Sequence, residues 1–268
     1  MSGSVIHSQS AAMIPAVYSA GQPASLPVAI DYPAALALRQ MSMVHDELPK
    51  YLLAPEVSAL LHYVPDLRRK MLLATLWNTG ARINEALALT RGDFSLAPPY
   101  PFVQLATLKQ RIEKAARTAG RTPAGQQTHR LVPLSDYWYV SQLQTMVATL
   151  KIPMERRNKR TGRTEKARIW EVTDRTVRTW IGEAVAAAAA DGVTFSVPVT
   201  PHTFRHSYAM HMLYAGIPLK VLQSLMGHKS ISSTEVYTKV FALDVAARHR
   251  VQFAMPESDA VAMLKQLS

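Results

Sequence analysis

The stretch LMGHKSISSTEVYTKV, residues 225–240, sets a histidine directly after a glycine and ends in a short helical pattern that carries Tyr237. The glycine closes one helical segment and the serines open the next, so the stretch predicts helix, turn and helix, the shape of many DNA-reading modules. A tyrosine at helical spacing usually belongs to a hydrophobic core. The role of Tyr237 therefore depends on the rest of the chain.

A second stretch, VTPHTFRHSYAMHM at residues 199–212, places His202, Arg205 and His206 on one helical face through spacings of three and four. Histidines four apart are spaced like metal ligands, but the Glu of the H-E-x-x-H pattern is absent and the guanidinium would repel a divalent ion. An arginine beside an imidazole suits a phosphate better, because Arg binds two phosphate oxygens and His exchanges protons near neutral pH. We expect a phosphate site and no metal, with a polar helix face as the alternative for the His–Arg pair alone.

The composition limits the classes of function. The chain has 268 residues, 48% of them hydrophobic, which is enough for one main domain and an appendage. Its formal charge of +11 indicates a polyanionic partner, either nucleic acid or an anionic membrane surface. No apolar run approaches the roughly 20 residues of a membrane span, and no signal-peptide pattern opens the chain, so we expect no membrane partner and a cytoplasmic location. The lack of cysteine excludes disulfides, thiolate metal sites and a cysteine nucleophile.

The hydrophobic pattern predicts a mainly α fold with a small antiparallel β-sheet, an α+β arrangement. Residues 1–50 are interrupted by prolines and carry two basic against three acidic residues, so they form a loose appendage to a main unit at 51–268. Residues 101–108 and 129–134 are expected to be strands of a hairpin around a long basic loop. Helices are expected over residues 55–64, 66–80, 82–90, 135–150, 173–192, 201–216, 218–227, 232–240 and 257–267.

Two basic segments are expected to contact the phosphates of a polyanionic partner. Residues 151–170 hold eight Lys or Arg against two Glu, a net charge of +6. Contacts with phosphates would position the protein without reading the base sequence, and a solvated charge run is the alternative. If the partner is DNA, the candidate contacts are Arg156, Arg157, Lys159, Arg160, Arg163 and Lys166, with Arg111 and Lys114 in the hairpin loop.

Three stretches in order resemble the signature motifs of the tyrosine recombinase, or lambda-integrase-like, family: TGARINEALALTRGDF (79–94), PHTFRH (201–206) and residues 225–240. The resemblance covers roughly residues 50–250 and includes HRLVPL (129–134), which is similar to the second arm of the family's catalytic hairpin. It implies the tyrosine recombinase catalytic-domain fold. It also implies the catalytic residues: Arg82 and Arg205 as the two arginines, His202 as the proton-handling histidine, His228 as the third phosphate ligand, Tyr237 as nucleophile and Lys109 as the catalytic lysine, with Lys114 as its alternative.

This set of residues suits transfer of a phosphodiester to tyrosine. Two arginines and an imidazole supply fixed positive charge where the non-bridging oxygens gain negative charge, so no metal or other cofactor is expected. A phenol with a reference pKa of about 10 must lose its proton to a neighbour or have its phenolate stabilised by the surrounding cations, and His202 is the candidate base. Lys109 would protonate the departing 5′ oxygen. Because the bond energy stays in a 3′-phosphotyrosyl intermediate, resealing needs no nucleotide.

The resemblance implies a site-specific recombinase that acts on double-stranded DNA as a homotetramer across two sites. The length and character of the chain favour the plasmid resolvases of the family, and so the conversion of plasmid multimers to monomers in a bacterial cytoplasm. Only about 50 residues precede the catalytic unit, where most family members carry a helical domain, so accessory proteins or DNA sites are expected to assist. The alternatives are an integrase or invertase, a type IB topoisomerase-like nicking-closing enzyme and a DNA-binding regulator without catalysis.

Overall fold

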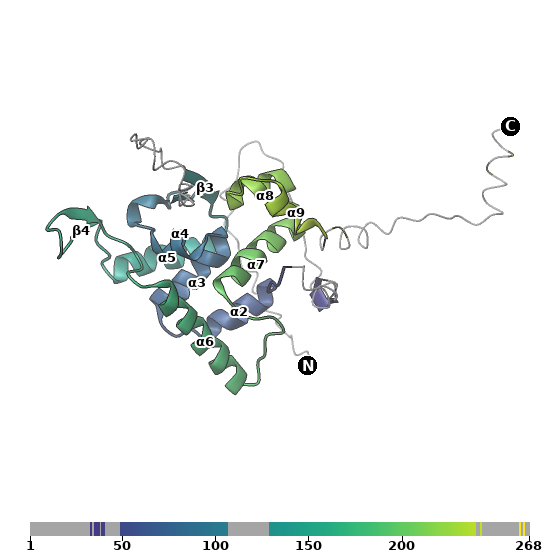
Figure 1. Ribbon diagram of the computed structural model, residues 1–268, viewed down its shortest axis with the longest axis horizontal. Coiled ribbons are helices and arrows are strands. Elements are labelled where there is room, and N and C mark those ends of the chain that lie inside the picture. Colours follow the sequence, from purple (N-terminus) through teal and green to yellow (C-terminus); the bar gives the residue numbers. More distant parts are fainter. Residues whose placement is uncertain are drawn as a thin grey trace, which may run out of the picture.

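The computed structural model describes residues 49–106 and 129–239, together with positions 33, 35–37, 39, 40, 242, 263 and 265. Within these ranges the chain is mainly helical, with one three-stranded and one two-stranded antiparallel sheet (Figure 1). The predicted fold class is confirmed. The helix expected at 257–267 falls largely outside the described residues, although Met263 and Lys265 are helical. Of the helices described, none combines the length and the apolar character needed to cross a bilayer.

Most helices follow the segments that the sequence predicts within a few residues. The helices are α2 (Ala54–His62), α3 (Leu67–Thr79), α4 (Ile83–Leu87), α5 (Tyr137–Thr149), α6 (Asp174–Ala190), α7 (Pro201–Tyr214), α8 (Leu219–Met226) and α9 (Ser232–Glu235), and a short 3-10 helix spans Arg91–Asp93. The helices predicted at 82–90 and 232–240 are shorter in the structure, and Tyr237 lies in a turn after α9 and not on the helix. Caps mark several of the helix ends. The Thr173 side chain caps α6 by accepting a hydrogen bond from the Thr176 backbone N–H.

Helix α3 ends at Gly80, which lies against α7. The Asp66 side chain caps the start of α3, and Gly80 ends it with φ 58°. A Cβ on Gly80 would lie only 2.4 Å from Cδ1 of Tyr208 on α7. Glycine at this position therefore allows both the left-handed turn and the close approach of α7, which brings the start of α4 next to α7.

The first sheet is formed by β1 (Phe94–Ser95), β2 (Phe102–Ala106) and β3 (His129–Pro133), in the order β1-β2-β3. The predicted hairpin is confirmed, since β2 and β3 pair with Val103 opposite Val132 and Leu105 opposite Arg130. Val103, Leu105 and Val132 point into the core. The loop between these strands lies outside the described residues, and with it lie Lys109, Arg111 and Lys114.

A second hairpin lies inside the basic block, where the sequence predicts charge but no strands. β4 (Glu155–Arg157) and β5 (Thr164–Lys166) pair with Arg156 opposite Glu165. Strands of three largely exposed polar residues lack the alternation of apolar and polar side chains that reveals a strand in a sequence. We call residues 155–166 the basic hairpin. Figure 1 shows it at the edge of the molecule, away from α7 and α8.

Two hydrophobic clusters hold the fold together. The larger packs α2 to α6 with β2 and β3 and takes in Phe204 of α7. The smaller packs Tyr208 and its neighbours on α7 against Leu222 and Met226 of α8 and against Tyr237. Helix α7 thus contributes to both clusters. The side chains at this junction form the candidate site.

Candidate active site

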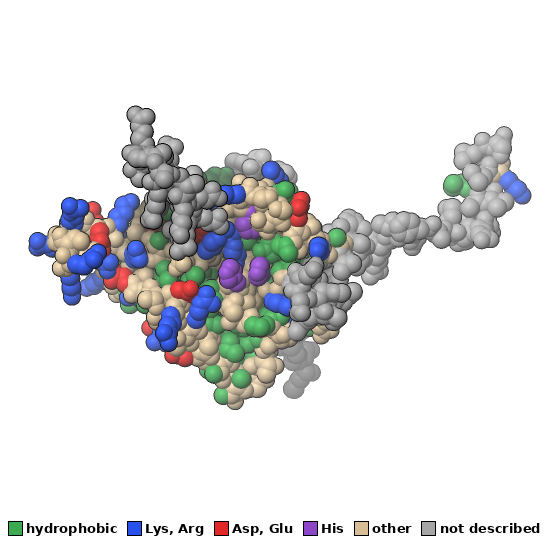
Figure 2. Space-filling model, viewed as in Figure 1, with side chains coloured by type: hydrophobic (Ala, Val, Ile, Leu, Met, Phe, Trp, Pro, Cys, Tyr) green, Lys and Arg blue, Asp and Glu red, His purple; other side chains and the backbone are tan. Residues whose placement is uncertain are grey.

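Five of the six predicted catalytic residues come together around α7. Arg82 immediately precedes α4, His202 and Arg205 lie on α7, and His228 and Tyr237 follow α8 and α9. The charges of Arg82 and Arg205 act on both His228 and Tyr237. Histidine side chains lie beside lysines and arginines near the centre of the face in Figure 2. The sixth residue, Lys109, lies outside the described part of the chain.

Arg82 is anchored by Glu85 and still faces outward. Its Nη1 lies 2.9 Å from Oε1 of Glu85, and its backbone N–H donates to Oε2 of the same carboxylate. The Glu85 side chain is buried, whereas that of Arg82 is 40% exposed. The carboxylate therefore fixes the base of the arginine and leaves part of the guanidinium free to meet an anion.

Arg130 on β3 is a buried part of the site that the sequence analysis did not assign. Its Nη2 donates to Glu85 Oε2 at 2.6 Å, and its Nε donates to the Leu225 carbonyl at 2.9 Å. A Cβ on Gly227 would lie 3.0 Å from Cδ of Arg130. Burial raises the pKa of the Glu85 carboxyl, but Arg130 and Arg82 outweigh burial and leave this pKa below its usual value. Arg130 thus links the Arg82 anchor to the turn before His228.

The alternation of residues along β3 could have indicated from the sequence that Arg130 is buried. Along β3, Arg130 is in phase with the buried Val132, so a period of two places an arginine on the core side of the strand. A buried arginine requires a carboxylate or carbonyl partner. The sequence did not show that Glu85 and Leu225 supply these acceptors.

Arg205 is 5% exposed and joins two helix ends. Its Nη1 donates to the Gly80 carbonyl, and its Nη2 donates to the Met226 carbonyl at 2.7 Å. These carbonyls lie at the C-terminal ends of α3 and α8, where the helix dipole favours a cation. Burial, Arg82 and Arg130 lower the pKa of Arg205 to about 10, so it stays charged at neutral pH. Arg205 therefore brings the turns before Arg82 and His228 to one place.

His228 is positioned by the turn that follows α8. Its Nδ1 lies 2.8 Å from the Thr234 hydroxyl, and its backbone N–H donates to the Gln223 carbonyl. Burial, followed by the charges of Arg205 and Arg82, lowers the pKa of His228 to about 4. The imidazole is therefore neutral at pH 7 in the free protein. In the tautomer whose Nδ1 accepts from the Thr234 hydroxyl, Nε2 carries the proton and can donate to an anion.

Tyr237 is 2% exposed, and its hydroxyl lies 2.9 Å from Nδ1 of His206. Burial raises the pKa of the Tyr237 phenol to about 12, against the opposing effect of Arg205 and Arg82. His202, the base that the sequence predicts, is exposed, and its ring stacks 6.2 Å from the ring of His206. The sequence placed His206 on the same helical face but assigned it no role.

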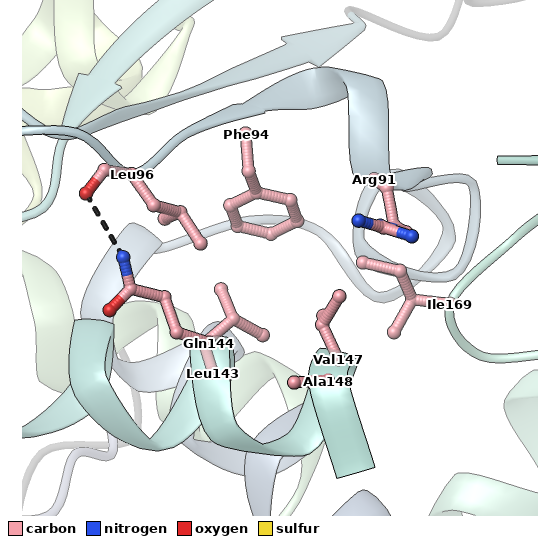
Figure 3. A pocket seen from close by; sticks show the side chains of 8 residues that line it. All are labelled: Arg91, Phe94, Leu96, Leu143, Gln144, Val147, Ala148 and Ile169. Atoms are coloured by element: carbon pink, nitrogen blue, oxygen red, sulfur yellow. Dashed lines mark hydrogen bonds between the residues drawn. The ribbon is translucent and has the colours of Figure 1, made fainter. Parts of the chain in front are cut away.

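A pocket of about 300 Å³ opens beside the two histidines. A second pocket, of about 320 Å³, lies between β1 and α5 and contains a hydrogen bond from Gln144 to the Leu96 carbonyl (Figure 3). Among the described residues no three His, Asp or Glu side chains gather as they would around a metal ion. The histidine pocket is lined by Lys50, Pro198, Thr200, His202, Thr203 and His206.

The basic hairpin presents most of its cations to solvent. Arg156 forms ion pairs with Glu165 at 2.7 Å and with Glu171 at 2.5 Å, so this predicted DNA contact already has two carboxylate partners. In Figure 2, lysine and arginine side chains gather at the edge where Figure 1 places β4. The exposed predicted contacts are Arg157, Lys159, Arg160, Arg163 and Lys166.

Known proteins share both the sequence and the fold of this chain. The model of the phage integrase family matches residues 50–243. A resolvase of Escherichia coli (strain K12) is 97% identical over 268 residues, which is 100% of both chains. A probable site-specific recombinase in the afa region of Escherichia coli is 47% identical over 257 residues, 95% of this chain and 97% of that one.

Solved structures of recombinases share the fold. The XerA recombinase superimposes with a TM-score of 0.55 and 19% identity over 77% of this chain and 67% of that one. The XerH site-specific recombinase bound to its difH substrate gives a TM-score of 0.51 and 17% identity over 80% of this chain and 54% of that one. The family match over residues 50–243 and the near-identity to a full-length relative agree with the geometry of the site: the chain belongs to the phage integrase family, the tyrosine recombinases.

Proposed function

We propose that this tyrosine recombinase resolves plasmid multimers to monomers, cutting and rejoining DNA through a covalent bond to Tyr237. One observation carries the catalytic assignment: a buried tyrosine hydroxyl lies in the field of Arg82 and Arg205 and next to a histidine. The resolution role is supported by the near-identical relative, which is named a resolvase.

The arrangement supports a division of roles around the scissile phosphate. Arg82 and Arg205 supply positive charge, and His228 supplies a hydrogen-bond donor, to the non-bridging oxygens as negative charge develops there. The oxygen of Tyr237 attacks phosphorus, the bond to the 5′ oxygen breaks, and a 3′-phosphotyrosyl bond forms. The protonation of the 5′ oxygen by Lys109 rests on the family resemblance alone.

The proposal includes the DNA complex. The exposed cations of the basic hairpin would contact backbone phosphates, which positions the duplex without specifying its sequence. Two sites held by a homotetramer, with accessory DNA-binding proteins, would provide the arrangement for strand exchange. The similar structure of the Tn1549 transposon integrase, which is in complex with a circular intermediate DNA, supports DNA as the partner.

Covalent trapping tests the catalytic assignment. A nicked suicide duplex with the resolution site is incubated with wild type, Tyr237→Phe and Tyr63→Phe, and adducts are separated on a denaturing gel. Tyr63 donates to Asp191 at the protein surface, so its variant is a matched loss of one hydroxyl. We expect the shifted band from wild type and Tyr63→Phe only. A band from Tyr237→Phe, or none from wild type that still binds the site, would refute the assignment.

A plasmid with two sites then distinguishes resolution from the alternatives. Conversion of the two-site plasmid into two separate circles supports a resolvase. Relaxation of supercoils without exchange would instead support a nicking-closing enzyme, which shares the phosphotyrosine chemistry but does not join two sites.

A further inference from the structure

The hydroxyl of Tyr237 contacts the histidine one helical turn after His202. The Oη atom lies 2.9 Å from Nδ1 of His206, and the two rings are 5.7 Å apart at an interplanar angle of 60°. A general base has to lie within hydrogen-bond reach of the proton that it removes, about 2.6–3.2 Å between heavy atoms. His206 already meets this condition in the free protein.

His202 lies in a different environment. It is exposed at the N-terminal end of α7 and lines the pocket beside the site, whereas Tyr237 is 2% exposed. A buried phenol exchanges its proton with the group that it contacts, and that group is His206. The His202 ring contacts the ring of His206 and lines the pocket.

We infer that His206 accepts the Tyr237 proton during DNA cleavage and that His202 does not. The inference rests on the proposed function and deepens it. As the Tyr237 O–H bond breaks, its proton passes to Nδ1 of His206 and its oxygen forms the bond to phosphorus. The bond from phosphorus to the 5′ oxygen breaks in the same step, and that oxygen takes a proton from the proposed acid, Lys109. During resealing, His206 returns the proton to Tyr237.

The charges around His206 make the transfer dependent on DNA. His202 and Arg205 flank it on α7, Lys50 lines the same pocket, and Tyr237 faces it from beyond α9. Burial, followed by His202 and Arg205, lowers the pKa of His206 to about 4, so the ring is neutral and is an acceptor in the free protein. A bound phosphodiester adds negative charge, which favours the imidazolium. The nucleophile therefore keeps its proton until substrate arrives.

Two substitutions separate proton transfer from positioning. In His206→Asn the amide oxygen takes the place of Nδ1, so it still accepts a hydrogen bond from Tyr237 but does not become protonated at neutral pH. In His206→Leu both functions are lost. In single-turnover cleavage of the suicide duplex we expect both variants to be slower than wild type by roughly 10²–10⁴-fold, the usual contribution of a general base. DNA affinity should stay at the wild-type level.

A modified substrate and a modified tyrosine show whether His206 acts on the Tyr237 proton or on the leaving 5′ oxygen. A 5′-bridging phosphorothiolate at the scissile position leaves as a thiolate and needs no acid, so it should not restore cleavage by His206→Asn. Replacing Tyr237 with 3-fluorotyrosine lowers the pKa of the phenol and should recover part of the lost rate. The control is His211→Asn on the same helix, whose imidazole packs 4.9 Å from the Trp77 ring and has a pKa lowered by burial. This control should cleave like wild type.

The outcomes distinguish this inference from the proposed function. Cleavage by His206→Asn at close to the wild-type rate would overturn the inference, because positioning alone would then suffice. Restoration of His206→Asn by the phosphorothiolate would also overturn it and assign His206 to the leaving group. In both cases the adduct still forms, so the proposed function stands. A wild-type protein that forms no adduct would remove both.

Discussion

Glu85 and Arg130 form a buried ion pair at the base of the site, with side chains only 1% and 8% exposed. Removing one partner leaves an uncompensated charge in the interior, which costs about 3–5 kcal/mol in comparable pairs. We expect Arg130→Met to lower the free energy of unfolding by about 3 kcal/mol in urea denaturation, because Arg82 compensates Glu85 only in part. The pKa of Glu85 should rise in the variant, since burial then prevails.

A double-mutant cycle tests whether the two charges depend on each other. Glu85→Gln combined with Arg130→Met removes both charges, so the double variant should be more stable than the sum of the single losses implies. Strictly additive losses would contradict the pairing. Arg130 therefore stabilises the site through hydrogen bonds to Glu85 and the Leu225 carbonyl, and the sequence alone does not reveal these contacts.

The basic hairpin is an element whose contribution to DNA binding can be measured by salt dependence. Each phosphate contact that is lost lowers the slope of log affinity against log salt concentration by about 0.9. We expect this decrease for Arg160→Gln, with similar decreases for Lys159→Gln and Arg163→Gln, and an unchanged preference for the target sequence. Titrations of labelled site DNA at several salt concentrations supply the slope.

The matched control for the hairpin is Arg175→Gln, which removes one exposed arginine from α6. Its slope should equal that of wild type. If Arg160→Gln and Arg175→Gln behave alike, the hairpin acts through net charge only and does not contact the backbone. Arg156 is a poor choice for this test, because its loss would also break its ion pairs with Glu165 and Glu171.

The sequence predicts the helices and strands that carry local signals, such as caps or an alternation of apolar and polar residues. It does not predict elements or contacts that form only through residues distant in the sequence. The Asp66 cap and the Gly80 stop delimit α3 in the sequence as they do in the fold. The strands of the basic hairpin carry no apolar alternation, so their pairing depends on contacts such as that between Arg156 and Glu165. Likewise, His206 and Tyr237 are 31 residues apart, and only tertiary packing brings them to 2.9 Å.

The candidate site lies between the two hydrophobic clusters of the fold. Phe204 of α7 belongs to the larger cluster that supports Arg82, and Tyr208 belongs to the smaller cluster that holds Tyr237. The charged groups between the clusters are held by helix-end carbonyls and by Glu85, while His206 and His228 remain neutral. Two uncharged imidazoles therefore lie among arginines in the folded protein, so the stability of the fold should depend on pH.

This arrangement predicts a loss of stability in mild acid. The pKa values of His206 and His228 lie near 4 in the folded protein, below the reference value of 6.5. Between these values the unfolded chain binds more protons than the folded chain, so stability is full above pH 6.5 and falls as the pH drops toward 4. The free energy of unfolding, measured in urea from pH 5 to 8, should decline on the acid side for wild type.

The variant His206→Asn/His228→Asn isolates these two groups. Its unfolding free energy should depend less on pH between pH 5 and 6.5, because neither asparagine takes up a proton on unfolding. Above pH 7 both histidines are neutral in the folded and the unfolded chain, so there the two curves should run parallel. The lowered pKa of Glu85 acts at lower pH, below its ordinary value of 4.5, and does not affect this comparison. An equally steep acid limb in the variant would show that other groups, rather than the imidazoles around Tyr237, set the acid stability of the fold.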